Sequence, residues 1–79
     1  MRLTATWIDG TTSIFETSYP NRVRERLVMD DIDRMGVRVA SRYLGGDGNV
    51  VTNPETLVIP PERVRDLCSL SVGSHVVYP

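Results

Sequence analysis

Apolar and polar residues alternate strictly near the beginning of the chain. Every second residue of the segment Leu3–Trp7 is apolar, and threonines stand between them; this period of two is typical of a strand with one buried face. The Asp9-Gly10 pair then supplies the left-handed backbone that a tight turn needs, and β-favouring residues resume directly after it. We therefore expect a β-hairpin with strands at residues 2–8 and 12–17.

Two registers of this hairpin fit the sequence. A two-residue turn would place Ala5 opposite Ile14, whereas a three-residue turn with a glycine bulge would place Ala5 opposite Phe15. The bulged version brings Trp7 and Phe15 onto one face of the hairpin, where both aromatic rings can be buried together. We therefore expect the bulged register.

The segment after the hairpin has the signals of a helix. Ser18 and Asn21 are candidate N-caps, and Pro20 suits a first helical turn because its missing N–H is not needed there. Apolar residues then follow at spacings of three and four, namely Val23, Leu27, Val28, Ile32 and Met35. Gly36 stands where a left-handed C-cap would end the helix. This pattern predicts one long helix over residues 21–35.

Short strands separated by turns are expected in the second half of the chain. Apolar and polar residues alternate over 37–43, which indicates a strand with one exposed face. The glycine-rich segment 45–49 predicts a chain reversal, and 50–51 and 56–59 are short β-favouring runs. Pro60 ends the last of these runs.

A second, shorter helix is expected over residues 61–69. Pro61 and Glu62 occupy positions that the first helical turn favours, and the residues expected to be buried are Val64, Leu67 and Cys68. Gly73 then precedes a final strand at residues 75–78. We expect one core to hold apolar residues from across the chain, namely Trp7, Leu27, Ile32, Leu57, Leu67 and Val76.

The expected order of elements is strand, strand, helix, strand, strand, short helix, strand. In this order the chain resembles the β-grasp, or ubiquitin-like, fold over nearly its whole length, from a hairpin turning at Gly10 to a closing strand. The resemblance implies a small α+β domain with a mixed sheet and one long helix ending at Gly36. Members that act as conjugated modifiers or sulfur carriers work through a C-terminal Gly-Gly, whereas this chain ends in Tyr78-Pro79. The resemblance therefore implies a binding module.

Composition indicates one small, nearly neutral domain at residues 1–79. Ten acidic residues against nine basic ones give a formal charge of −1, too balanced for the general phosphate attraction of most nucleic-acid-binding proteins. All nine basic residues are arginines. A GC-rich genome, such as that of an actinobacterium, its phage or a mobile element, favours arginine over lysine. Alternatively, the arginines serve binding, because their planar fork suits carboxylates and phosphates.

The sequence offers little for catalysis or metal binding. His75 is the only histidine, so one chain cannot assemble a catalytic triad or a two-histidine metal site. Cys68 is the only cysteine, so the chain has no internal disulfide, and we expect this residue to be buried. Asp30, Asp31 and Asp33 are expected to form a solvated helix face, paired with neighbouring arginines. We therefore expect no catalytic residue, no metal and no cofactor.

Two rows of arginines are the candidate partner-binding residues. Arg22 and Arg26 would share a face of the long helix, with Arg24 nearby, and Arg38 and Arg42 would project together from the following strand. Joined into one patch, they could hold carboxylates or phosphates through bidentate hydrogen bonds. All are expected to face solvent, so the core should need none of them.

These features favour a small, non-catalytic protein-binding module, such as an adaptor or inhibitor that a phage or mobile element directs at a host protein. The partner would offer an acidic surface or pair with an exposed sheet edge, and such an edge could also form a homodimer. The alternative is a nucleic-acid-binding accessory protein that uses the arginine patch. The lack of a disulfide pair and of a long apolar run favours a cytoplasmic protein that does not bind membranes.

Overall fold

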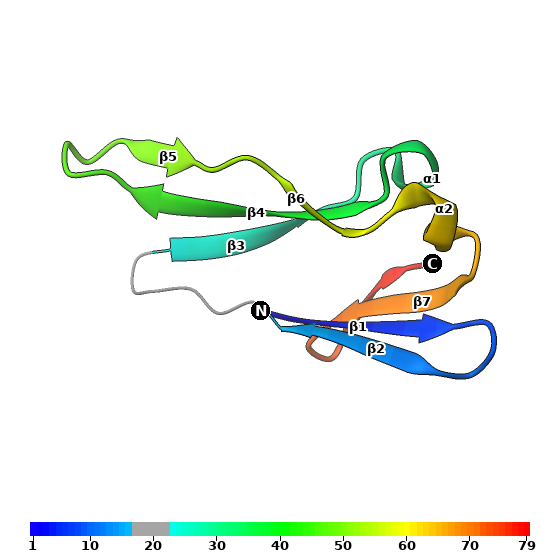
Figure 1. Ribbon diagram of the computed structural model, residues 1–79. Coiled ribbons are helices and arrows are strands. Elements are labelled where there is room, and N and C mark those ends of the chain that lie inside the picture. Colours follow the sequence, from blue (N-terminus) through cyan, green and yellow to red (C-terminus); the bar gives the residue numbers. More distant parts are fainter. Residues whose placement is uncertain (17–22) are drawn as a thin grey trace.

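Two sheets account for most of the chain in a computed structural model that describes residues 1–16 and 23–79. Within these residues there are eight strands, namely β1 (Arg2–Trp7), β2 (Thr12–Glu16), β3 (Val23–Val28), β4 (Val37–Leu44), β5 (Val50–Thr52), β6 (Thr56–Ile59), β7 (Leu67–Val72) and β8 (His75–Tyr78). The same residues include two one-turn helices, α1 (Ile32–Met35) and α2 (Pro61–Val64). Sheet A has the order β2-β1-β7-β8, and sheet B has the order β3-β4-β5 with β6 also paired to β4 (Figure 1).

The N-terminal hairpin is confirmed, but its register differs from both that we considered. A three-residue loop turns at Gly10, whose φ of 88° is left-handed as expected, and the pairing sets Ala5 opposite Ser13 and Leu3 opposite Phe15. Since residues two apart share a face, Trp7 and Phe15 still lie on the same side. The Trp7 Nε1–H donates a hydrogen bond to Ser13 Oγ at 2.8 Å, which fixes the indole beside the hairpin.

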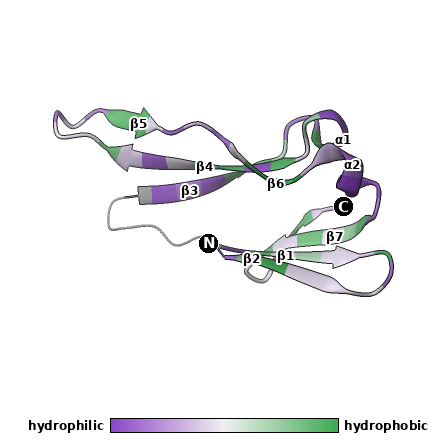
Figure 2. Cartoon of the chain, viewed as in Figure 1, coloured by the Kyte–Doolittle hydropathy of each residue, from purple (hydrophilic) through white to green (hydrophobic). Residues whose placement is uncertain are grey.

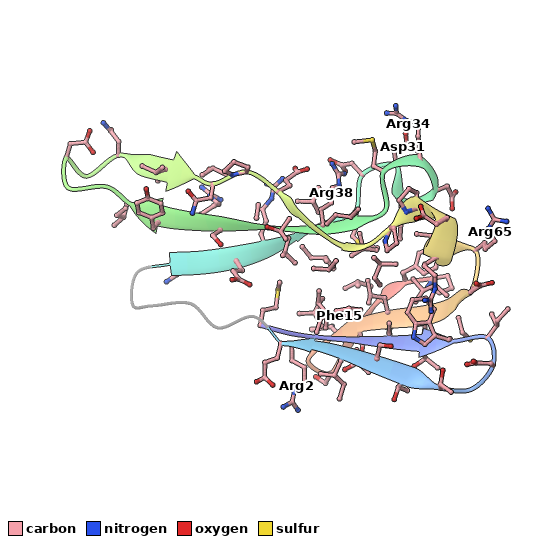
Figure 3. The ribbon with its side chains drawn as sticks, viewed as in Figure 1. Arg2, Phe15, Asp31, Arg34, Arg38 and Arg65 are labelled. Carbon is pink, nitrogen blue, oxygen red and sulfur yellow. The ribbon has the colours of Figure 1, made fainter. Side chains whose placement is uncertain are left out.

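The core lies between sheet A and the adjoining half of sheet B. Its buried members come from both sheets and α2, namely Leu3, Ala5, Trp7, Val37, Val39, Ile59, Val64, Leu67 and Leu70. Phe15 is half-buried against them (Figure 3). Of the six residues expected in the core, Trp7 and Leu67 are buried, and Leu27 and Ile32 pack at its margin. The expectation of burial is wrong for the other two, since Leu57 is 50% exposed and Val76 is 65% exposed.

The long helix expected over 21–35 is not formed in the part of it that the structure describes. Val23–Val28 is instead strand β3, which pairs along its whole length with β4, while residues 21 and 22 lie outside the described chain. Only the one-turn helix α1 remains, and Gly36 with φ 77° ends it as expected. The physical reason is tertiary, because pairing with β4 supplies the backbone hydrogen bonds that a helix would otherwise make.

The second expected helix, over 61–69, is also shorter than the sequence suggested. It ends at Val64, and Leu67 already begins strand β7. Cys68, expected to be buried, is exposed in this strand. The remaining expectations for the second half of the chain are confirmed, since strands form near 37–43, 50–51, 56–59 and 75–78 and a turn joins β4 to β5.

The described residues thus form a small, mostly β structure that is compatible with an α+β domain. All pairings between the described strands are antiparallel, whereas the sequence suggested a mixed sheet. The resemblance to the β-grasp fold depended on one long helix, and that helix is replaced by β3 in the described residues. The resemblance therefore stays a hypothesis.

One end of sheet B extends beyond the core as an arm, which we define as residues 24–26 and 41–52 (Figure 1). No side chain in the arm is buried. The whole molecule measures 47 × 24 × 15 Å, and its radius of gyration of 13.7 Å exceeds the value of about 11.6 Å for a compact domain of this length. Neither helix in the described part of the chain has the length and hydrophobicity that crossing a membrane requires.

Candidate functional site

Three exposed arginines share one face of the arm. In the β3–β4 pairing Arg24 stands directly opposite Arg42, and Arg26 stands opposite Ala40. Paired residues of an antiparallel ladder share a face, and so do residues two apart on one strand. Arg24, Arg26 and Arg42 therefore project from the same side of sheet B, and all three are exposed.

Like charges that face each other across a ladder destabilise the pairing. Arg24 and Arg42 form such a pair. The ion pairs between described residues involve other arginines, namely Arg2 with Glu16, Arg34 with Asp31 and Arg38 with Glu55. Within the described chain, no carboxylate thus neutralises the three arm arginines. The arm holds a local positive charge although the whole protein is slightly acidic.

A surface hollow of about 620 Å³ lies beside these arginines. It is lined by residues of β3, β4 and β5, namely Arg24, Glu25, Arg26, Arg42, Tyr43, Leu44 and Val50. Leu44 and Val50 are paired across the β4–β5 ladder and are 56% and 54% exposed. In Figure 2 the hydrophilic strand β3 and the hydrophobic strand β5 flank β4 on this arm. The hollow therefore combines guanidinium groups with exposed aliphatic side chains.

Glu25 lies on the opposite face of β3, since it stands between Arg24 and Arg26 and opposite Ser41. Its Oε2 atom is buried and accepts no hydrogen bond. Buried polar atoms normally have a partner, and an unmet acceptor carries a cost. Glu25 therefore has an unused acceptor on the face opposite the arginines.

The turn that ends the arm is ordered by its own side chains. Asp47 accepts hydrogen bonds from the backbone N–H and the side-chain amide of Asn49, at 3.0 and 2.9 Å. These bonds, the backbone bond foremost, hold the pKa of the Asp47 carboxyl below its ordinary value of 3.8. The charged form of Asp47 thus stabilises the turn that joins Leu44 to Val50.

Arg38 is not part of the exposed row, contrary to expectation. Its guanidinium donates to Glu55 Oε2 at 2.6 Å and to the backbone oxygen of Asp30 at 3.1 Å, and the side chain is only 14% exposed. Figure 3 shows Arg38 on the part of β4 near α1, away from the arm's tip. Arg38 therefore joins β4 to two neighbouring segments and is not available to a partner.

The four predicted binding residues have different outcomes. Arg26 and Arg42 are exposed as expected and share one face of sheet B. Arg38 is engaged within the protein, and Arg22 lies outside the described residues. The sequence places Arg24 only near this row, whereas in the structure it stands directly opposite Arg42. The signal that could have found it was the two-residue spacing of Arg24 and Arg26, which places them together on a strand but not on a helix.

Other arginines lie in different parts of the molecule. Arg2 and Arg65 project from sheet A and from the end of α2, away from the arm (Figure 3). Arg63 stacks over the Trp7 ring, with its guanidinium carbon 4.4 Å from the ring centroid, an arrangement that favours a cation–π interaction. The arginines of residues 1–16 and 23–79 therefore do not form a single patch.

The other candidate chemical groups are dispersed. His75 is exposed in β8 and Cys68 is exposed in β7. Asp31 has a left-handed backbone and pairs with Arg34 one turn along α1. Among the described residues there is no group of three side chains that could ligate a metal ion. Comparison with known proteins finds no matching family model, no matching curated protein and no matching solved structure.

Proposed function

We propose that the protein is a small, non-catalytic binding module whose arm docks onto an acidic surface of a protein partner. The observation that carries this proposal is the row of Arg24, Arg26 and Arg42, exposed together and without counter-charges from the described residues. A partner's carboxylates would remove the repulsion between Arg24 and Arg42 and accept charge-assisted hydrogen bonds. A cytoplasmic location and an origin in a phage or mobile element stay predictions.

A protein partner fits the hollow better than a nucleic acid does. Leu44 and Val50 line it together with the arginines and share their face of the ladder, and arginine beside apolar side chains is typical of protein interfaces. Exposed aliphatic side chains contribute nothing to contacts with a phosphate backbone. The formal charge of −1 also gives no long-range attraction to nucleic acid.

Affinity capture with matched variants tests the proposal. Immobilised wild type, an Arg24→Ala/Arg42→Ala variant and an Arg2→Ala/Arg65→Ala control would be incubated with extract of the native host. We expect a protein that wild type and control retain and that the arm variant loses, with binding weakened by about 1–3 kcal/mol in a subsequent titration. Equal retention by all three proteins would contradict a role for the arm.

The nucleic-acid alternative has its own readout. If the three arm arginines contacted phosphates, affinity for random DNA or RNA would fall about 40-fold between 50 and 200 mM salt, from a slope of about −0.9 per contact. The arm variant would then bind random oligonucleotides more weakly than the control does. That outcome would favour the accessory-protein reading over the protein-binding one.

A further inference from the structure

We infer that the arm binds an extended acidic segment, which adds to the outer edge of β3 as a further strand and carries carboxylates at alternate positions. This inference rests on the proposed function and specifies the form of its partner. Among the described strands β3 pairs with β4 alone. Its other edge therefore presents backbone N–H and C=O groups that an incoming strand can pair with.

The spacing of the arginines selects the spacing of the carboxylates. An added strand places every second side chain on the arginine face, at a repeat of about 6.6–6.8 Å. Arg24 and Arg26 have the same repeat because they are two residues apart on β3. Carboxylates at positions i and i+2 of the partner can therefore each meet one guanidinium. Arg42 stands behind Arg24 and increases the positive potential at that position.

Glu25 specifies the residue between the two carboxylates. It is on the other face of β3, where the partner's residue i+1 would lie beside it. The Glu25 side chain is partly exposed and carries a carboxylate, so a hydroxyl or ammonium group at that position can meet it without repulsion. A third carboxylate there would instead face Glu25. The favoured pattern is acidic, then Ser, Thr or Lys, then acidic.

A second copy of this chain is disfavoured at this edge in the pairing that brings the charged residues of both copies together. A symmetric antiparallel pair of β3 strands centred on Glu25 would set Arg24 opposite Arg26 twice and Glu25 opposite itself. All of these contacts are between like charges, which are destabilising when they face each other. The charged edge therefore disfavours that self-pairing and favours an acidic strand.

Synthetic peptides test this inference directly. The first is a nine-residue peptide with glutamate at alternate positions and threonine between, and the second has the same composition with its glutamates consecutive. A third is the alternating peptide with N-methyl groups on the amides of one edge, and a fourth carries them on the other edge. Binding would be measured by titration calorimetry against wild type, Arg24→Ala, Arg24→Gln and Arg2→Ala, each checked for folding by circular dichroism.

We expect the alternating peptide to bind wild type and Arg2→Ala at least about 10-fold more tightly than the consecutive one. Both substitutions of Arg24 should remove this preference, and N-methylation of one edge should abolish binding whereas methylation of the other should not. Equal affinity for the two unmethylated peptides would overturn strand addition while leaving an acid-binding arm intact. Failure of both peptides to bind would also overturn the inference. The proposed function itself is contradicted only if the captured partner does not depend on the arm.

Discussion

At the scale of single residues, Arg38 shows how position within a strand decides the role of a cation. Its strand neighbours are buried, and its guanidinium contacts Glu55 and the backbone of Asp30, on segments to either side of β4. Arg42, four residues further along the same strand, is exposed on the arm. The two arginines have the same chemistry, but only Arg42 can contact a partner without loss of internal contacts.

We predict that Arg38→Ala lowers the free energy of unfolding by about 1–3 kcal/mol, because it removes two hydrogen bonds of a charged donor and leaves Glu55 without its partner. Arg42→Ala should change stability by less than about 0.5 kcal/mol, as is usual for an exposed side chain. Urea unfolding of both variants measures the difference. Equal stability of the two would mean that the Arg38–Glu55 contact is as weak as a surface pair.

Gly36 is a second position where a small change in the side chain is expected to alter the stability of the protein. A Cβ there would lie 2.3 Å from the Ile59 backbone oxygen, and φ is +77°. Gly10 has a similar φ of +88° but open space around it. We predict that Gly10→Ala costs about 1–2 kcal/mol, from backbone strain alone, whereas Gly36→Ala costs about 3 kcal/mol or more because β6 must also move.

The control for both variants is Gly46→Ala, since Gly46 has open space and no left-handed backbone. Its effect should be within about 0.5 kcal/mol. Thermal or urea unfolding of the three variants ranks them. A loss at Gly36 no larger than that at Gly10 would show that the contact between α1 and β6 yields easily.

At the scale of elements, turns were predictable from sequence and the choice between helix and strand was not. The Asp9-Gly10 turn and the 45–49 reversal follow from residues that tolerate left-handed backbone, and both are observed. The segment 23–28 is ambiguous, because Val23 and Leu27 fit both a helical spacing of four and a strand spacing of two. Pairing with β4 makes this segment a strand, and a short stretch of sequence around residues 23–28 does not reveal that pairing.

The register of the N-terminal hairpin was also not predictable from the sequence. Every candidate register of the hairpin satisfies the same local rules, and the observed one sets Leu3 opposite Phe15. This register keeps Phe15 on the face of sheet A that packs against the core, which is formed by residues far away in sequence. The candidate site had the same limit: Arg26 and Arg42 were found from their charge and predicted exposure, but the facing pair Arg24 and Arg42 required the β3–β4 register.

Two leucines separate a core position from a peripheral one. Leu70 on β7 is fully buried, whereas Leu57 on β6 is half exposed. We predict that Leu70→Ala costs about 2–5 kcal/mol and that Leu57→Ala costs about 1 kcal/mol or less. Urea unfolding of the two variants compares the same leucine-to-alanine substitution at the two positions. Similar losses at both positions would place Leu57 in the core, as the sequence suggests.

At the scale of the whole molecule, the structure divides into a packed body and an arm without a core of its own. The body contains every buried side chain of the cluster that sheets A and B share. The arm carries the candidate site, and its pairings are stabilised by ladder hydrogen bonds and partly exposed side chains. Binding surfaces are often drawn from such low-stability parts of a protein. An edge-paired homodimer stays a prediction, and the uncharged strand β8 suits it better than β3 does.

This division predicts that the arm opens without unfolding the body. Ladder amides of residues 41–44 should exchange hydrogen about 100-fold faster than those of Leu3 and Leu70, because opening the arm exposes little apolar surface. Hydrogen exchange followed by NMR measures each amide, and Leu70→Ala serves as the internal control. That variant should accelerate exchange in β1 and β7 while leaving the arm unchanged, since the arm opens by a separate event. Acceleration of both regions together would show that arm and body unfold as one unit, and a partner of the arm would then stabilise the whole protein.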